Sequence, residues 1–308
     1  MELSYPFARV FPDSTNLLNV FFCHDAEHST FHQIGEIGTG IVDFCELDFS
    51  EVQKKIQALE TMAVANAGFE DIKTRFWEAV DLLKDKHSYA HFFLNGELLR
   101  NFNHPERTEE ERISYAAFLF HYSLNLQGHY REALELCLNT EVLIEYALSE
   151  RYVMFCNLHP DSTRYILRSM YGIAPMANGK FDAGKVIQFD DPGKVDTQKV
   201  LQDIHQDSEH AVSMWQYFAI QSLEEMLYLE LMEMIKRGIR VKRCALCDRY
   251  FVLIDKRKRD YCDRLYKGKR TCKQIGAKQK FNKLVADDTY LQEFQQIYNR
   301  MYSRYYRM

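Results

Sequence analysis

The sequence has no apolar stretch that approaches the ~18–20 uninterrupted residues needed to cross a lipid bilayer. Its richest candidate, residues 226–235, is interrupted by Glu230 and Glu233. The chain begins Met-Glu-Leu-Ser, without the basic and then apolar regions of a secretory signal. We therefore expect a soluble, cytoplasmic protein.

Glycine and proline are also scarce, with 13 and 6 residues among 308. This scarcity excludes a collagen-like chain and a chain dominated by loops. Apolar residues make up 46% of the sequence and aromatic residues 14%, which is enough for a packed core and too much for a disordered chain. The length fits one large domain or two ordinary ones.

The formal net charge of −5 hides an uneven distribution. Residues 1–239 contain 20 Lys or Arg and 37 Asp or Glu, whereas residues 240–308 contain 19 and 7. The two segments therefore carry net charges of −17 and +12. This difference predicts an acidic body followed by a basic C-terminal module.

The body reads as mainly helical after a first part with a few strands. Short apolar runs at residues 17–22 and 41–44 alternate with turn-forming residues and favour strands. A helical pattern covers residues 51–172, where Thr108 and Glu111 predict a capping box and Gly128 a helix end.

Two further segments connect this body to the C-terminal module. Residues 176–200 are typical of a loop with one strand at 185–189. A long helix is predicted from about residue 208 to Lys236, ending at Lys236-Arg237-Gly238. The predicted fold class is therefore mainly α (α+β), with a helical N-terminal body, a long connecting helix, and a zinc ribbon followed by terminal helices. The predicted boundaries are 1–205, 206–239 and 240–308.

Four of the eight cysteines lie close together near the C-terminus: Cys244, Cys247, Cys262 and Cys272. A Cys-x2-Cys turn presents two thiolates to a tetrahedral zinc ion, and residues 250–254 read as a strand that brings the second pair back. No histidine follows His210, so a local site has cysteine ligands only, which is typical of a closed, structural zinc site. A redox Cys-x2-Cys pair and simple buried thiols are the rival interpretations. Nine residues separate Cys262 from Cys272, and a water or a distant Cys or His would complete the site if Cys272 did not reach it.

The motifs of this segment resemble a known class of zinc finger. The run Arg243-Cys-Ala-Leu-Cys-Asp-Arg-Tyr-Phe, a basic turn and Asp260-Tyr-Cys-Asp are similar to a bacterial CGNR-type zinc finger. They resemble still more an uncharacterised family of Firmicute bacteria that has a helical body and the same C-terminal module. The resemblance covers roughly residues 222–308 and implies that the four cysteines ligate zinc. Thr271-Cys-Lys-Gln-Ile-Gly stands where the Cys-Gly-Asn-Arg signature would be. The CGNR-type similarity implies a DNA-binding or regulatory role.

The cysteines are surrounded by basic residues. Residues 256–283 contain twelve Lys or Arg and only two acids, Asp260 and Asp263. A scaffold that holds these cations on one surface attracts phosphates, and Tyr261, Tyr266 and Phe281 are placed to stack on bases or to pack on the ribbon. The candidate nucleic-acid-binding residues are Lys256, Arg257, Lys258, Arg259, Arg264, Lys267, Lys269, Arg270, Lys273, Arg300 and Arg304.

The chain finishes with a predicted amphipathic helix that is capped at residues 287–289. Arg300, Arg304 and Arg307 follow one side and extend the basic surface. Its apolar stripe is expected to pack on the zinc module or on the long helix. The stripe consists of Tyr290, Phe294, Ile297, Tyr298, Met301 and Tyr305.

Other constellations are weaker. His24, His28 and His32 are spaced for one helix face, but their segment lacks a helical pattern and reads as a polar loop. Asp182, Asp190, Asp191 and Lys194 resemble a metal-dependent nuclease site only loosely. We expect the thiols outside the cluster to behave as small buried apolar groups. They include Cys45, Cys137 and Cys156.

Three hypotheses follow from these patterns. The first is a non-enzymatic, zinc-stabilised nucleic-acid-binding protein with one structural zinc ion per chain, with DNA as its partner and a regulatory role. The second is a protein-interaction module whose basic ribbon docks on an acidic partner or on its own body. The third, a metal-dependent nuclease, rests on the carboxylates of residues 182–191. None of the three involves a membrane.

Overall fold

The computed structural model describes residues 6–12, 15–25, 28–64, 68–160, 167–177, 180–181, 198, 211–253 and 259–305. The chain divides into two compact units. Unit 1 consists of Met1–Leu138 and Val142–Ile239, and unit 2 consists of Asn139–Glu141 and Arg240–Met308. No helix in the described ranges combines the length and the apolar character that crossing a membrane requires.

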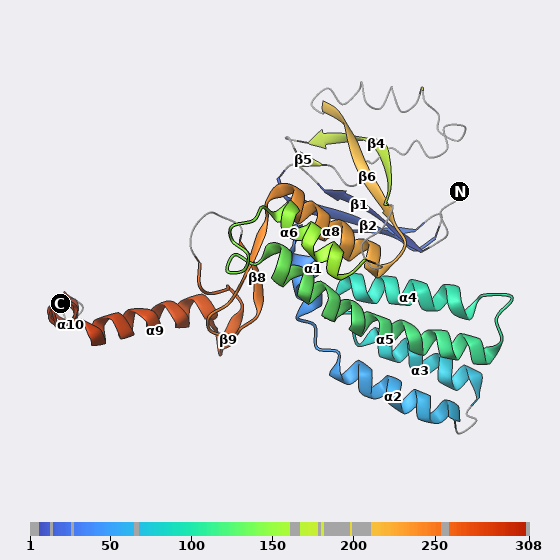
Figure 1. Cartoon of the computed structure of the whole chain (residues 1–308), viewed down its shortest axis with the longest axis horizontal. Helices are drawn as coiled ribbons and strands as arrows, with labels where there is room; N and C mark the ends of the chain where they lie inside the picture. Colours follow the sequence, from blue (N-terminus) through green and yellow to red (C-terminus); the bar gives the residue numbers. More distant parts are fainter. Residues whose placement is uncertain are drawn as a thin grey trace. The chain divides into compact units, whose positions relative to one another are not determined.

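Unit 1 contains a six-stranded sheet in which all neighbouring strands are antiparallel (Figure 1). Its strand order is β3-β2-β1-β6-β4-β5. The strands are β1 (Phe7–Pro12), β2 (Leu17–Cys23), β3 (Ser29–Glu36), β4 (Arg168–Ala177), β5 (Lys180–Phe181) and β6 (Ala211–Ile220). Val10 of β1 pairs with Val20 on one side and with Phe218 on the other, so the start of the chain and β6 share one sheet.

Helices form the larger part of unit 1 (Figure 1). They are α1 (Thr39–Cys45), α2 (Ser50–Val64), α3 (Phe69–Asp81), α4 (Ser88–Phe102), α5 (Glu109–Ala133), the π-helical turn η1 (Leu134–Leu138), α6 (Leu148–Leu158) and α8 (Leu223–Arg237). Helices α2 to α5 pack side by side, and the ring centroid of Phe76 lies 6.0 Å from those of Phe102 and Phe120. The predicted mainly helical fold class with a few strands is confirmed.

The start of α5 follows its predicted signal, whereas its end does not. The backbone N–H of Glu111 donates to the Thr108 hydroxyl at 3.3 Å, and the Glu111 carboxylate accepts from the Thr108 N–H at 2.8 Å. The predicted helix end at Gly128 is wrong, because α5 continues to Ala133 and into η1. The buried residues Tyr130 and Ala133 extend the apolar face past the glycine, and this burial outweighs its poor helix propensity.

Residues 41–44 lie in α1 and not in the strand that the apolar run favours. A short apolar run cannot distinguish a strand from a buried helical turn. Here Ile41, Val42 and Phe44 are all buried, and Gly38, with φ 100°, turns the chain into the helix. The run is apolar because helix α1 is buried in the core of unit 1.

The long helix predicted from residue 208 is also wrong in its first part. Residues 211–220 form β6, which pairs with β1 and β4. Their β-branched and aromatic side chains favour a strand, although the spacing also fits a helix. Helix α8 starts after Ser222, whose hydroxyl accepts from the Glu225 N–H, and it belongs to unit 1. Its predicted end is confirmed, because Gly238 has φ 70° and its N–H donates to the Ile235 carbonyl. The strand predicted at residues 185–189 lies outside the described residues.

A buried carboxyl group, that of Glu230, joins α1 to α8. Glu230 is fully buried, and its carboxylate accepts from the backbone N–H groups of Gly38, Gly40 and Ile41 at 2.7, 3.1 and 2.8 Å. Helix α1 has no side-chain cap of its own, so Glu230 satisfies its first amides from a distant element. Burial raises the pKa of Glu230 to about 7, although these three donors oppose the rise.

Unit 2 consists of two small hairpins and two helices. Its elements are β7 (Arg240–Arg243), β8 (Tyr250–Leu253), β9 (Leu265–Lys267), β10 (Arg270–Thr271), α9 (Cys272–Asp287) and α10 (Thr289–Tyr305). Strand β7 pairs with β8 and β9 pairs with β10, both antiparallel. The predicted cap of the last helix is confirmed, since the Asp288 carboxylate accepts from the N–H groups of Tyr290 and Leu291.

Candidate metal centre and basic surface

The first pair of cysteines lies in the tight turn between β7 and β8. The Cys244 N–H donates to the Arg249 carbonyl and the Asp248 N–H donates to the Cys244 carbonyl, both at 2.9 Å. Asp248 has φ 57°, a left-handed conformation that closes the turn. This geometry presents the thiols of Cys244 and Cys247 on the same side, as a metal-binding knuckle requires.

The nine residues between Cys262 and Cys272 form the β9–β10 hairpin, which turns at Gly268 with φ 59°. The hairpin brings the two cysteines at its ends close together, since the Lys273 N–H donates to the Cys262 carbonyl at 3.0 Å. Cys272 is the first residue of α9, where Thr271 and Gln274 form a capping box. The long gap before Cys272 is therefore the length of a hairpin, and Cys272 reaches the other three cysteines.

The Sγ atoms of the four cysteines lie within 4.8 Å of one another. A tetrahedral ion with Zn–S bonds of ~2.3 Å would separate neighbouring sulfurs by about 3.8 Å, and the Cys247 and Cys262 sulfurs are 3.7 Å apart. Cys244, Cys262 and Cys272 are buried. No other group of three or more potential ligands occurs in the part of the chain that the structure describes. The cluster can bind a metal ion.

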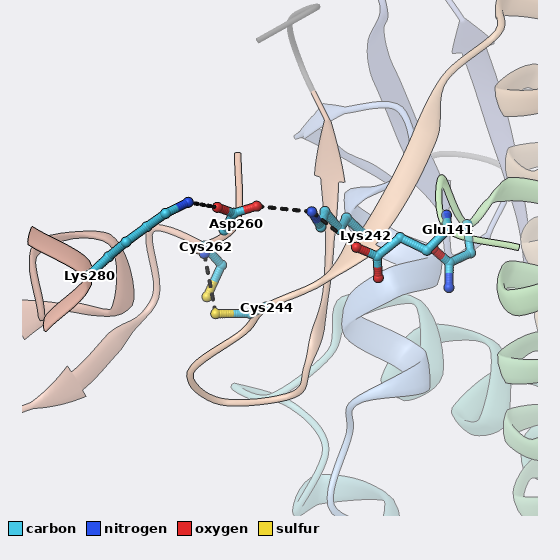
Figure 2. A network of polar contacts seen from close by, with 7 residues as sticks. Glu141, Lys242, Cys244, Asp260, Cys262 and Lys280 are labelled. Atoms are coloured by element: carbon cyan, nitrogen blue, oxygen red, sulfur yellow. Dashed lines mark hydrogen bonds and ion pairs between the residues drawn. The ribbon is translucent and has the colours of Figure 1, made fainter. Parts of the chain in front are cut away.

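Backbone amides favour ionisation of one thiol of the cluster, that of Cys244. Burial raises the pKa of the Cys244 thiol, but hydrogen bonds from the backbone of Cys262, Cys247 and Leu246 outweigh it and lower the pKa to about 7. One of these, from the Cys262 N–H to the Cys244 Sγ at 3.4 Å, is drawn in Figure 2. Burial and the neighbouring thiols raise the pKa of Cys272. A bound cation would allow the remaining thiols to ionise.

A chain of ion pairs beside the cysteine cluster connects β7, α9 and Glu141 (Figure 2). The Asp260 carboxylate contacts Lys242 of β7 at 3.0 Å and Lys280 of α9 at 2.8 Å, and Lys242 also contacts Glu141 at 3.1 Å. Lys280, the largest cause, and Lys242 lower the pKa of Asp260. Sequence reasoning missed this role, and the signal was available: Asp260 is one of only two acids in a strongly basic segment.

The first turn of α9 packs closely on the loop before Cys262. Gly276 lies one turn after Cys272, and a Cβ atom there would overlap the ring of Tyr261. Tyr261 and the buried Phe251 both contact the cysteine cluster. Unit 2 therefore has a small core in which the four sulfurs occupy the centre and no spare volume remains beside Gly276.

We expect Gly276→Ala to destabilise unit 2 by about 1–3 kcal/mol, because the added methyl group forces the Tyr261 ring from its position. Denaturant unfolding of the full chain measures the change. Gly128→Ala is the matched control, because nothing lies within 4 Å of its added Cβ and a helix interior favours alanine by up to about 1 kcal/mol. Equal stabilisation by both substitutions would contradict the packing on Tyr261.

The structure divides the candidate nucleic-acid-binding residues into three groups. Lys256, Arg257 and Lys258 lie outside the described residues. Arg259 and Lys273 approach Asp263 at 3.5 and 3.6 Å. The half-buried Arg264 donates to the Tyr250 carbonyl at 2.6 Å and so joins the two hairpins. The third group is exposed and, within the described ranges, has no carboxylate partner: Lys267, Lys269, Arg270, Arg300 and Arg304.

Helix α10 does not pack on the cysteine-containing module, which is one of the two partners that the sequence predicts. None of its residues is buried, and Tyr290, Phe294 and Met301 are 83%, 62% and 66% exposed. The rings of Phe294, Tyr298 and Tyr302 stack along the helix at centroid distances of 6.4 and 6.0 Å. Amphipathic spacing identifies an apolar face but not its partner, and no described element of unit 2 covers this one. Of the other aromatic residues, Tyr266 and Phe281 are exposed.

The weaker constellations form no further metal site among the described residues. His24 and His28 flank the turn between β2 and β3, and His32 lies in β3. Asp25 contacts His28 at 2.9 Å. The carboxylates at 182, 190 and 191, with Lys194, lie outside the described residues. Outside the cluster, Cys45 and Cys137 are buried and Cys156 is half-buried.

Two hairpins joined by four cysteines define unit 2 as a compact module with a candidate metal site. A family described as "Family of unknown function (DUF6076)" matches residues 193–308, which include β6, α8 and the larger segment of this module, Arg240–Met308. No curated protein and no solved structure matches the chain.

Proposed function

We propose that unit 2 is a zinc-stabilised module that binds nucleic acid, with DNA as the first candidate. The four sulfurs lie within 4.8 Å of one another and supply a soft, all-cysteine ligand set, which suits zinc and is typical of a closed site without a reactive water. Zinc in this proposal is structural, with one ion per chain.

The observation that carries nucleic-acid binding is the β9–β10 hairpin. Both ends of this hairpin are candidate metal ligands, Cys262 and Cys272, and its exposed cations are Lys267, Lys269 and Arg270. No carboxylate in the described part of the chain neutralises these cations, so they stay available to phosphates. A rigid loop loses little conformational entropy when it binds. The exposed ring of Tyr266 lies on β9 next to Lys267, where it can stack on a base.

A triple variant of the full chain, Lys267→Ala with Lys269→Ala and Arg270→Ala, tests this surface. Each cation that neutralises a phosphate of duplex DNA adds about 0.9 to the magnitude of the slope of log affinity against log salt. We expect the slope of the triple variant to be smaller in magnitude by about 2–3 than that of the wild type. The variant should also bind more weakly at every salt concentration. Fluorescence anisotropy with labelled DNA duplex and with RNA of equal length measures both quantities.

The matched control removes three exposed cations of unit 1, Lys54, Arg75 and Lys84, and so changes the net charge equally. It should keep the wild-type slope. Equal effects of both triple variants would assign the binding to net charge and contradict a hairpin site. If the zinc-loaded chain binds neither DNA nor RNA at low salt, the proposal is wrong and an acidic protein becomes the better candidate partner.

A further inference from the structure

Unit 1 contains an aromatic pocket between α4, α5 and α8 that the basic module does not involve. Three rings follow one face of α5 at Tyr115, Phe118 and Tyr122. The Tyr115 and Phe118 centroids are 6.0 Å apart, and the Phe118 and Tyr122 rings stack at 5.6 Å with an interplanar angle of 21°. Phe118 is 53% exposed, so the wall that these rings form opens to solvent.

Carboxylates lie at the other sides of the pocket. Glu97 of α4 and Glu224 of α8 line a cavity of about 110 Å³ together with the rings. The Tyr122 hydroxyl donates to the Glu224 carboxylate and thereby fixes both groups. Glu97 pairs with Arg100 at 3.0 Å, and Arg100 also donates to the carbonyls of Pro6 and Gln221.

Two of the residues that line the pocket, Glu97 and Glu224, are acidic, and no Lys or Arg is among them. Besides burial, the charges of Glu97 and Glu224 raise the pKa of Glu225, the next residue of α8. Burial and the charge of Glu97 also raise the pKa of the Tyr115 phenol, although Arg107 and Arg100 oppose the rise. The start of α8 does not offset this charge with open amides, because the Ser222 hydroxyl accepts from the Glu225 N–H and the Glu225 carboxylate accepts from the Gln221 N–H. These two amides are therefore not available to an anion, and the two carboxylates that line the pocket attract a cation.

Aromatic faces select the kind of cation. The faces of Tyr and Phe rings attract cations, and the Arg107 guanidinium already lies 4.2 Å from the Tyr115 centroid. A metal ion or a bare ammonium would lose hydration that rings cannot replace. A methylated ammonium is weakly hydrated, and its methyl groups can contact the rings while its charge faces the carboxylates.

We propose that the pocket between Tyr115, Phe118, Tyr122, Glu97 and Glu224 is a binding site for a methylated ammonium group. The site belongs to unit 1 and is independent of the function proposed for unit 2. It places a ligand-binding site in the acidic body of the protein, with rings for shape and carboxylates for charge.

The test compares choline with dimethylbutanol, its uncharged carbon analogue, by calorimetric titration of the full zinc-loaded chain. The two probes have the same shape, so only the charge distinguishes them. We expect choline to bind at one site and dimethylbutanol to bind at least ten-fold more weakly. Failure of choline to bind, or equal binding of both probes, would overturn the proposal.

Two variants locate the site. Phe118→Ala should weaken choline binding about five-fold, which corresponds to one ring–cation contact. Glu224→Gln keeps an acceptor for Tyr122 but removes the charge, so it should weaken choline and leave dimethylbutanol unchanged. Phe281→Ala, an exposed ring of unit 2, is the matched control and should bind choline as the wild type does. Wild-type affinity in both pocket variants, with melting curves that show folded protein, would place the choline site elsewhere and contradict the assignment.

Discussion

Removal of the proposed zinc ion is expected to unfold unit 2 and to leave unit 1 folded. The centre of unit 2 is made of Cys244, Phe251, Cys262 and Cys272, and only a few half-buried residues pack against them. A core of this size cannot offset the conformational entropy of the segment without the metal, which contributes about 10–16 kcal/mol at structural four-ligand sites. Unit 1 has its own core around the sheet and helices α2 to α5. Hydrogen exchange with and without a chelator should show lost protection in α9 and the two hairpins and unchanged protection in α5.

Two cysteine variants make the same test without a chelator. Cys272→Ser should lose the zinc and with it the protection of unit 2, because the ion would keep three sulfur ligands only. Cys156→Ser removes a half-buried thiol of unit 1 and should keep one zinc per chain by elemental analysis. A Cys272→Ser protein with full zinc content would show that the site is not the closed four-sulfur site proposed above.

The stability of unit 1 is expected to fall as the pH rises from about 4.5 through about 7. Burial raises the pKa of Glu230 from its ordinary 4.5 to about 7. The folded state therefore holds this proton more tightly than the unfolded state, and the stabilisation is complete below the unfolded pKa. It is lost as the pH passes the folded pKa, with a difference of roughly 3 kcal/mol by pH 8.

Denaturant unfolding across this pH range, with Glu230→Gln beside the wild type, isolates the contribution. The glutamine carries no titrating proton, so the variant should lack this fall in stability. It should also be less stable at low pH, because its amide nitrogen cannot accept from the Ile41 N–H. Glu233→Gln, on the same helix, leaves Glu230 in place and should keep the wild-type fall. Parallel pH curves for the wild type and Glu230→Gln would show that Glu230 titrates alike in the folded and unfolded states.

Local signals in the sequence predicted local structure well. The Thr108–Glu111 capping box, the cap at Asp288 and the glycine end of α8 depend on neighbouring residues, so the sequence alone specifies them. The same is true of the Cys-x2-Cys knuckle, whose turn needs only Cys244 to Arg249. The four-cysteine cluster was therefore the part of the candidate site that the sequence predicted best.

Features that depend on distant partners could not be read in this way. Strand β6 has a spacing that also fits a helix, and pairing with β1 and β4 decides the outcome. Glu230 reads as a break in an apolar run, yet it satisfies amides about 190 positions earlier in the chain. The nine residues before Cys272 are longer than an ordinary metal-binding knuckle. They contain the β9–β10 hairpin, which has no strong turn signature in the sequence beyond Gly268. The division of the basic residues into paired and unpaired groups required their positions in space.

Asp260 changes how the charge of unit 2 should be counted. Its carboxylate lies between the ammonium groups of Lys242 and Lys280, in the role that a phosphate oxygen would otherwise take. Asp263 similarly approaches Arg259 and Lys273. Residues 240–308 therefore offer a polyanion fewer cations than their 19 Lys and Arg, and the number of counterions released on binding should follow the unpaired cations alone. Replacing Asp260 would return Lys280 to that count, whereas Lys242 would keep Glu141 as its partner, and the contact that joins α9 to β7 would be lost.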